Sequence, residues 1–188
     1  NILIKEDLLH LSDIIYALLH FIRVMFLKFP SNTENGFDVS KLIKEEINSF
    51  NGLSSAIEGI LNYRFVRRLK EKNVHLKLVV DWWESQGLDK GFHLALNSYY
   101  PDVPVIGYLG YAPRDLELQL YPTEYESNAH VIPEEIGVIG KGFVESIKRY
   151  YPQQKVIKVP AFRFQHLWDE KEINKKFNAS VLVALTVL

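Results

Sequence analysis

The chain has 188 residues, of which 47% are hydrophobic and 24% charged, and its formal net charge is −1 at pH 7. This balance excludes a disordered chain, and it provides no overall basic field that would attract nucleic acid. The absence of cysteine excludes disulfides and thiolate metal sites, and it is compatible with a reducing cytoplasm.

Residues 2–28 are predicted to form one helix. Apolar side chains recur in it at three- and four-residue steps, namely Leu8, Leu11, Ile15, Leu18, Ile22 and Met25. Charged residues such as Asp13 and Arg23 interrupt the apolar stretch, which is therefore too short to span a bilayer. We expect this helix to pack against the domain. Binding to a membrane surface and pairing with another chain are left as alternatives.

Two more helices are predicted over residues 39–50 and 54–72. In the second, Ser55 and Glu58 have the spacing of a capping box. We therefore interpret residues 1–74 as a helical segment that packs on the domain that follows it.

Beyond this segment, short β-branched runs alternate with helical patterns. Strands are predicted over residues 75–81, 103–108, 136–139, 155–159 and 180–187. One intervening helix is expected to be capped by Asp89, the next begins with Thr123 and Glu126 at capping-box spacing, and the last carries Phe143 and Ile147 on one face. The alternation predicts an α/β fold: a Rossmann-like parallel sheet flanked by helices. Right-handed crossovers are expected to place helices on both faces of the sheet.

The Rossmann-like domain is predicted to cover residues 75–168. The charged stretch 169–179 breaks the pattern, so residues 169–188 are interpreted as a linker and the first strand of a following domain. Because the chain starts without Met and stops inside an apolar run, we expect it to be a piece of a longer polypeptide.

The loop after the first predicted strand is the richest candidate site, because ligands of open parallel sheets bind beyond the carboxyl ends of the strands. It combines two tryptophans, three carboxylates and an amide in the ten residues 81–90 (DWWESQGLDK). Tryptophan rings can stack on sugars, Glu and Gln can bond to hydroxyls, and a carboxylate can act as a general base. In the alternative interpretation, the tryptophans belong to the core and Asp89 only caps a helix.

Two glycine-containing turns follow other strands. Residues 107–114 (GYLGYAPR) offer tyrosine rings and a backbone that a ligand can approach closely, or they form a plain turn. The turn Gly140–Lys141–Gly142 suits an anion at a helix N-terminus, or it simply allows tight packing.

The segment after the fourth predicted strand places polar groups among aromatic residues. Arg163 can pair with a phosphate or carboxylate, and His166 can act as a base near neutral pH. An interdomain contact is the alternative. The other histidines and the carboxylates lack metal-ligand spacing, so no metal site is expected.

Four runs in residues 75–188 resemble bacterial surface-carbohydrate biosynthesis proteins, the glycosyltransferase-like proteins of lipopolysaccharide and capsule pathways with GT-B architecture. These runs are VVDWWESQGLDKGFHLAL, PVIGYLGYAP, PEEIGVIGKGFVE and VPAFRFQHLW. The resemblance implies two Rossmann-like domains, with the acceptor on the N-terminal one and the nucleotide-sugar on the C-terminal one. This chain would then be the acceptor-side domain. The donor motifs that the family carries later in the chain are absent from it.

The resemblance also implies roles for single residues. Glu84 is the first candidate for the base that deprotonates the acceptor hydroxyl, and Asp89 and His166 are the alternates. The residues expected to hold the substrate are Trp82, Trp83, Gln86, Tyr108, Gly110, Tyr111, Lys141, Arg163 and Gln165. No cofactor is expected, since the nucleotide-sugar is a co-substrate bound mainly by the other domain.

The leading hypothesis is thus a cytoplasmic glycosyltransferase fragment that acts on a surface-polysaccharide or lipopolysaccharide acceptor. Its expected partners are the acceptor, the nucleotide-sugar and a second domain of the same polypeptide. Contact with the inner face of the membrane is left open, and nucleic acid is not expected. A second hypothesis is a non-catalytic carbohydrate-binding or scaffold module of a surface-polysaccharide assembly. A third is an unrelated nucleotide-binding enzyme that uses the Gly140 turn.

Overall fold

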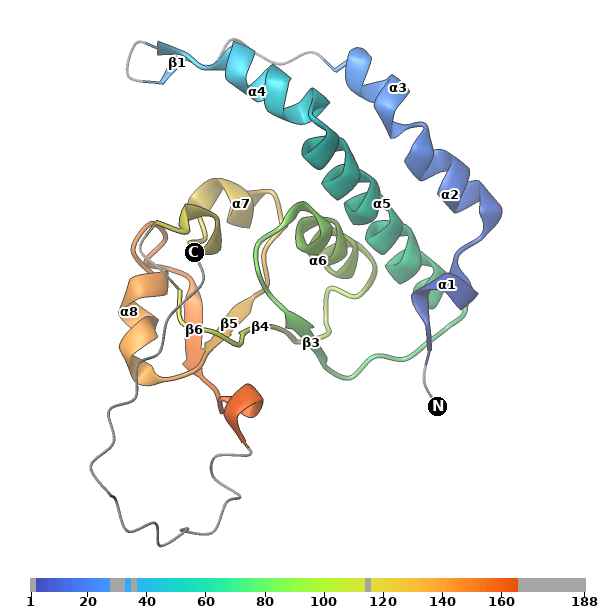
Figure 1. Ribbon diagram of the computed structural model, residues 1–188. Helices are drawn as coiled ribbons and strands as arrows, with labels where there is room; N and C mark the ends of the chain where they lie inside the picture. The colour runs from blue at the N-terminus through green and yellow to red at the C-terminus, as the bar shows by residue number, and fades with distance from the viewer. Residues whose placement is uncertain (1–2, 28–32, 35–36, 114–115, 166–188) are drawn as a thin grey trace, which may run out of the picture.

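The computed structural model describes residues 3–27, 33–34, 37–113 and 116–165 (Figure 1). It confirms the predicted fold class, a Rossmann-like α/β arrangement in which helices flank an all-parallel sheet, preceded by a helical segment. The predicted strand at residues 180–187 and the linker before it lie outside the described residues.

Four parallel strands form the sheet in the order in which they occur in the chain. They are β3 (Val79–Trp82), β4 (Val105–Leu109), β5 (Glu135–Val138) and β6 (Lys155–Lys158). β3 begins later than predicted, because its first pair is Val79 with Val105 and the preceding Pro104 has no N–H to extend the ladder. The Pro104 carbonyl still accepts the N–H of Val79.

The connecting helices lie on one face of the sheet in the described part of the chain, not on both as expected. These elements are α6 (Gly87–Tyr99), α7 (Glu124–Asn128) and α8 (Val144–Ile147), and Figure 1 shows α6 and α7 on the same side. The reason is the strand order: right-handed crossovers between strands that follow one another in a single direction all return over the same face.

The main core lies between this face and its helices. Trp83, Leu109, Ile136 and Val138 come from the strands or their ends, and Ile147 comes from α8; all are at most 1% exposed. The last predicted helix is shorter than expected: a 3₁₀ turn, η2 (Lys141–Phe143), leads directly into α8. Two other 3₁₀ turns are η1 (Leu118–Leu120) and η3 (Phe162–Phe164).

A long helix, α5 (Phe50–Glu71), packs outside α6. The two helices cross closely because Gly59 and Gly91 have no side chains at the crossing. A Cβ on Gly59 would lie 2.6 Å from the carbonyl oxygen of Gly87, and a Cβ on Gly91 would overlap the backbone of Gly59. α5 starts earlier than predicted, capped by Ser49, whose hydroxyl accepts the N–H of Gly52. The predicted capping box at Ser55 is wrong, because that residue lies inside the helix.

The first predicted helix is broken into three: α1 (Lys5–Leu8), α2 (Leu11–Leu18) and α3 (His20–Met25). Leu9 and His10 are extended, and the chain re-enters helix where the carboxylate of Asp13 accepts the N–H of His10 at 3.0 Å. Figure 1 shows α2 and α3 nearly in line beside α5. A short hairpin, β1 (Thr33–Glu34) with β2 (Phe37–Asp38), and α4 (Ser40–Asn48) connect α3 to α5.

Candidate functional site

The carboxyl end of β3 carries the residues that the sequence singled out. Side chains alternate along this strand: Val79 and Asp81 point toward α6, whereas Val80 and Trp82 point to the opposite face and are 59% and 46% exposed. Trp82 is therefore the tryptophan that a ligand can reach.

A hydrogen-bonded cluster surrounds the carboxylate of Glu84. The indole N–H of Trp82 donates to Glu84 Oε1 at 2.7 Å, and the side-chain amide of Gln86 donates to Oε2 at 2.7 Å. The sequence predicted these three residues as site residues, and the loop brings their polar groups together at the surface. Both carboxylate oxygens are engaged, so the cluster presents an oriented carboxylate and amide beside an exposed aromatic ring.

Trp82 is also the first ring of an aromatic row on the open face of the sheet. Its ring lies 5.6 Å from that of Tyr108, which lies 5.5 Å from that of Phe162. The Tyr108 hydroxyl donates to the Pro160 carbonyl and accepts the N–H of Phe162, so it ties η3 to this face. Tyr108 is 7% exposed, and its contacts hold Trp82 and η3 in place.

Gly110 acts through its lack of a side chain. A Cβ at this position would clash with the outer edge of the Trp82 ring and lie 2.7 Å from Tyr108. Gly110 therefore lets the indole lie across the end of β4. Tyr111, the next residue, is half-buried and packs against the main core.

Asp89 is a buried residue in the first turn of α6 that hydrogen-bonds the backbone of the preceding loop. Its Oδ2 accepts the backbone N–H groups of Glu84 at 3.1 Å and of Gln86 at 2.9 Å, and the residue is 3% exposed. Burial raises the pKa of Asp89, against the opposing effect of these two hydrogen bonds. Ser85, between the two donors, adopts φ 57°, and this left-handed turn allows both N–H groups to point at one carboxylate. These contacts match the helix-capping interpretation of Asp89.

Trp83 is a core residue, which corrects its assignment as a sugar-binding side chain. It is 0% exposed and packs edge-on against His93, with the ring centroids 5.1 Å apart. The alternation of the strand explains the difference, because adjacent tryptophans must point to opposite faces.

Sequence reasoning missed a buried pair beneath this loop. The Nε2 atom of His93 lies 3.1 Å from the carboxylate of Asp81, and the histidine is 0% exposed. In the sequence, His93 is one of several histidines without metal-ligand spacing. The signal for the pair is that His93 lies nearly two turns into a helix that must pack back on the predicted strand ending at Asp81.

The remaining predicted site residues in the described ranges, Lys141, Arg163 and Gln165, are exposed and do not take part in the hydrogen bonds of the Glu84 cluster. Lys141 opens η2 beside Gly140, which adopts φ 122°, and Arg163 and Gln165 lie in and after η3. His166 falls outside the described residues. In the described ranges, no group of three His, Asp or Glu side chains is close enough to hold a metal ion, and no helix is long and apolar enough to cross a bilayer.

A hollow lies on the side of α6 that faces α5. It is a cavity of about 410 Å³ between α2, α5 and α6, lined in part by Tyr16, Tyr63, Arg64 and Tyr99. The Arg64 guanidinium lies over the Tyr16 ring and near Asp13, and the two other tyrosines share a hydroxyl hydrogen bond. Arg64, Tyr63 and Tyr99 therefore already have partners within the protein.

Comparison with known proteins gives no match: no protein-family model, no curated protein and no solved structure resembles this chain at a significant level.

Proposed function

We propose that the carboxyl edge around Trp82 binds carbohydrate, as the acceptor side of a glycosyltransferase-like protein of surface-polysaccharide or lipopolysaccharide synthesis. The observation that supports this most directly is the half-exposed Trp82 indole held beside the Glu84–Gln86 pair. A sugar offers an apolar ring face and a rim of hydroxyls, and this surface offers an aromatic face next to paired hydrogen-bonding groups.

The position in the fold supports the same proposal. Ligands of open parallel sheets bind beyond the carboxyl ends of the strands, where Trp82 and Glu84 lie. Asp89 and the buried His93–Asp81 pair support this loop from below through hydrogen bonds. In a two-domain enzyme of GT-B type this edge would face the nucleotide-sugar domain, in the cytoplasm, with Glu84 as the acceptor base.

The contacts of Glu84 favour a second candidate, a carbohydrate-binding module without catalysis. Both of its oxygens already accept hydrogen bonds, from Trp82 and from Gln86. A base must accept a proton from the acceptor hydroxyl, so one of these bonds would have to yield when the acceptor binds. A module needs no such change.

Binding is tested by ligand-observed NMR on this chain, with a panel of surface oligosaccharides and nucleotide-sugars. We expect oligosaccharide binding without nucleotide binding. Trp82→Ala should weaken that binding by about tenfold or more, since it removes the stacking face. Tyr125→Ala is the matched control, because Tyr125 is an 87% exposed aromatic residue on α7, which contributes no side chain to the Glu84 cluster. Equal loss in both variants, or binding of neither ligand class, would contradict the proposal.

Catalysis is tested by Glu84→Gln in a polypeptide that includes the second domain. The substitution keeps the shape of the side chain and an oxygen for the Trp82 N–H. Loss of turnover with unchanged acceptor binding would support Glu84 as the base. Wild-type turnover at saturating acceptor would rule out that role, and binding without any turnover in the wild type would favour the module.

A further inference from the structure

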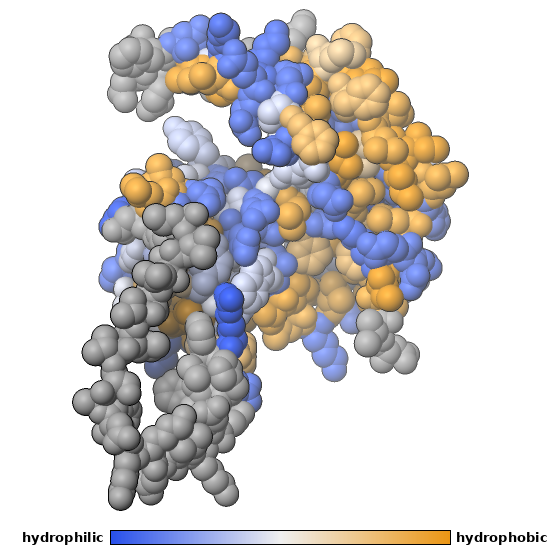
Figure 2. Space-filling model, in the orientation of Figure 1, coloured by the Kyte–Doolittle hydropathy of each residue, from blue (hydrophilic) through white to orange (hydrophobic). Residues whose placement is uncertain are grey.

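The outer face of α2 and α3 exposes an unusual amount of apolar surface. Apart from Tyr16, which lines the cavity beside α5, ten large apolar side chains between Leu11 and Leu27 are each 37–77% exposed. With roughly 100 Å² from each, the patch is on the order of 1,000 Å², larger than the ~300–600 Å² patch of a typical monomer. Figure 2 shows this surface as a continuous apolar region over α2 and α3.

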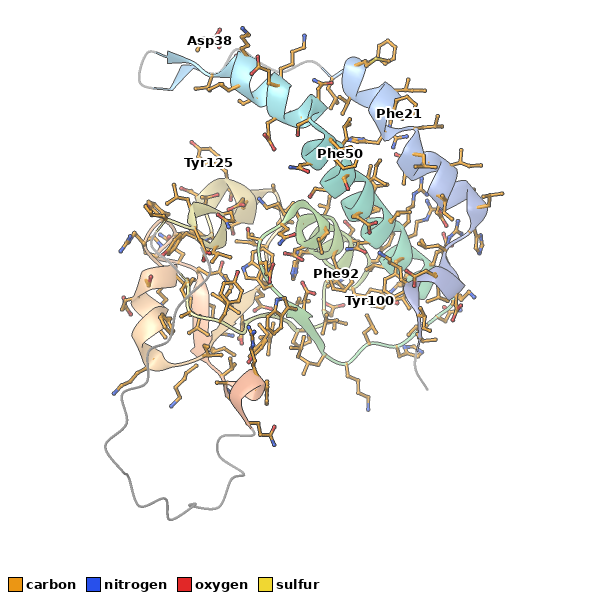
Figure 3. All side chains as sticks on the ribbon, in the orientation of Figure 1. Phe21, Asp38, Phe50, Phe92, Tyr100 and Tyr125 are labelled. Atoms are coloured by element: carbon orange, nitrogen blue, oxygen red, sulfur yellow. The ribbon has the colours of Figure 1, made fainter. Side chains whose placement is uncertain are left out.

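Five of these exposed positions form a regular seam. The spacing from residue to residue alternates between three and four, as at the a and d positions of a coiled coil. The seam residues are Leu11, Ile14, Leu18, Phe21 and Met25, which are 41–72% exposed. Phe21 lies on α3 in Figure 3.

The two helices are continuous enough to present this seam as one rod. Leu19, between them, keeps helical dihedral angles; its N–H donates to the Ile15 carbonyl, and its own carbonyl accepts the N–H of Arg23. The buried positions lie on the opposite side: Asp13, Ala17 and Val24 face the protein. The seam is therefore separate from the contacts that hold the helices on α5.

The apolar face also lacks the Lys and Arg side chains that would favour a membrane surface as its partner. Asp13 and Arg23 are the only Asp, Glu, Lys or Arg residues from 11 to 27. Asp13 is 1% exposed and paired with Arg68, and Arg23 lies over the Tyr16 ring and donates to the Tyr16 carbonyl. Helices that lie on membranes carry Lys and Arg along their polar border, whereas this rod turns its one carboxylate inward.

We propose that α2 and α3 pair with the same helices of a second copy of this chain, through the seam centred on Leu18. In a two-fold dimer the same patch serves both partners, so a face with exposed charges of one sign would repel itself, and an uncharged seam does not. The patch also meets the ~800 Å² per partner of a standard interface. The dimer leaves the carboxyl edge of the sheet uncovered, so this proposal is independent of carbohydrate binding.

The first test is sedimentation velocity of the chain over a hundredfold range of concentration. We expect a concentration-dependent shift from one chain to two. Leu18→Lys should weaken dimerisation by at least tenfold, because it places a charge at the centre of the seam. The control Leu116→Lys changes an equally apolar side chain that is 92% exposed and distant from the seam in sequence, and it should leave dimerisation unchanged. Circular dichroism checks that both variants are folded.

The second test uses the absence of cysteine from the sequence. A single Leu18→Cys substitution should give a disulfide-linked dimer on mild oxidation, because the central residue meets its symmetry mate in either helix orientation. The control Leu116→Cys should not. A chain that stays monomeric throughout, a dimer unaffected by Leu18→Lys, or a monomer that binds anionic phospholipid vesicles through this face would each overturn the proposal.

Discussion

The outer helical layer and the sheet layer distribute polar and apolar groups in opposite ways. The sheet layer builds its core from aliphatic and aromatic side chains such as Leu109 and Ile136, and beside the buried His93–Asp81 pair it holds ion pairs such as Lys155 with Glu135 at the surface. The pair α2–α3 does the reverse. It buries the carboxylate of Asp13 against Arg68 and Arg64, and exposes leucine, phenylalanine and methionine.

This difference shows what holds each layer. The sheet layer is stabilised by burial of apolar area, which needs no particular partner. The inner side of α2 depends on a charge pair with defined geometry, since Arg68 donates to both oxygens of Asp13 at 2.8 and 3.0 Å.

The largest effect is expected from Asp13→Asn. The change leaves Arg68 and Arg64 without their buried counter-charge, so the free energy of unfolding should fall by about 3 kcal/mol or more. Urea denaturation followed by circular dichroism measures it. Asp7→Asn, at an exposed carboxylate of α1, is the control and should change stability by less than about 0.5 kcal/mol. Equal effects at both sites would mean that the pair does not hold α2 in place.

A second substitution tests the junction between the two layers. Gly91→Ala should force α5 and α6 apart, because its Cβ would overlap the backbone of Gly59, and the expected loss is about 2 kcal/mol. The matched change Gly142→Ala meets nothing within 4 Å and should be nearly neutral. A neutral result at Gly91 would show that the helices can separate without cost.

Within the sheet layer, Asp89→Ala should cost about 1–2 kcal/mol, since two backbone N–H groups lose their acceptor. Asp89→Asn should cost less, because one amide oxygen can accept both bonds and the burial that raises the pKa of Asp89 no longer opposes a charge. Thermal unfolding of both variants gives the ranking. A larger loss for Asn than for Ala would show that the charge itself is needed.

The most gradual effect is a pH dependence. Burial alone would raise the pKa of Asp13, but hydrogen bonds from Arg68 and the His10 N–H, with the charges of Arg68 and Arg64, hold it below its usual range. The stability from this pair is therefore complete above the ordinary Asp pKa of about 4, and is lost as the pH falls through the lower folded-state value.

This loss is at most about 1.4 kcal/mol per pH unit. Urea midpoints of the wild type and Asp13→Asn should therefore converge in acid. A difference between the two that stays constant down to acid unfolding would contradict the lowered pKa.

The local patterns of the sequence determined the fold class and much of the candidate site. β-Branched runs separated by helical patterns predicted four of the strands in the described residues, and Thr123 with Glu126 correctly predicted the start of α7. The strand-end rule also selected Trp82, Glu84 and Gln86, whose polar groups do meet. These features depend on periodicity and short-range capping, which a single sequence displays directly.

Only the tertiary structure decided which side of an element faces what. The order of the strands put the connecting helices on one face, and the pleat of β3 sent Trp83 into the core while Trp82 stayed exposed. Arg68, 55 residues away in sequence, turned the charged side of α2 inward and its apolar side outward. Which side of an element is buried depends on contacts between residues that are distant in sequence. The local pattern of a single segment does not contain the energies of these contacts.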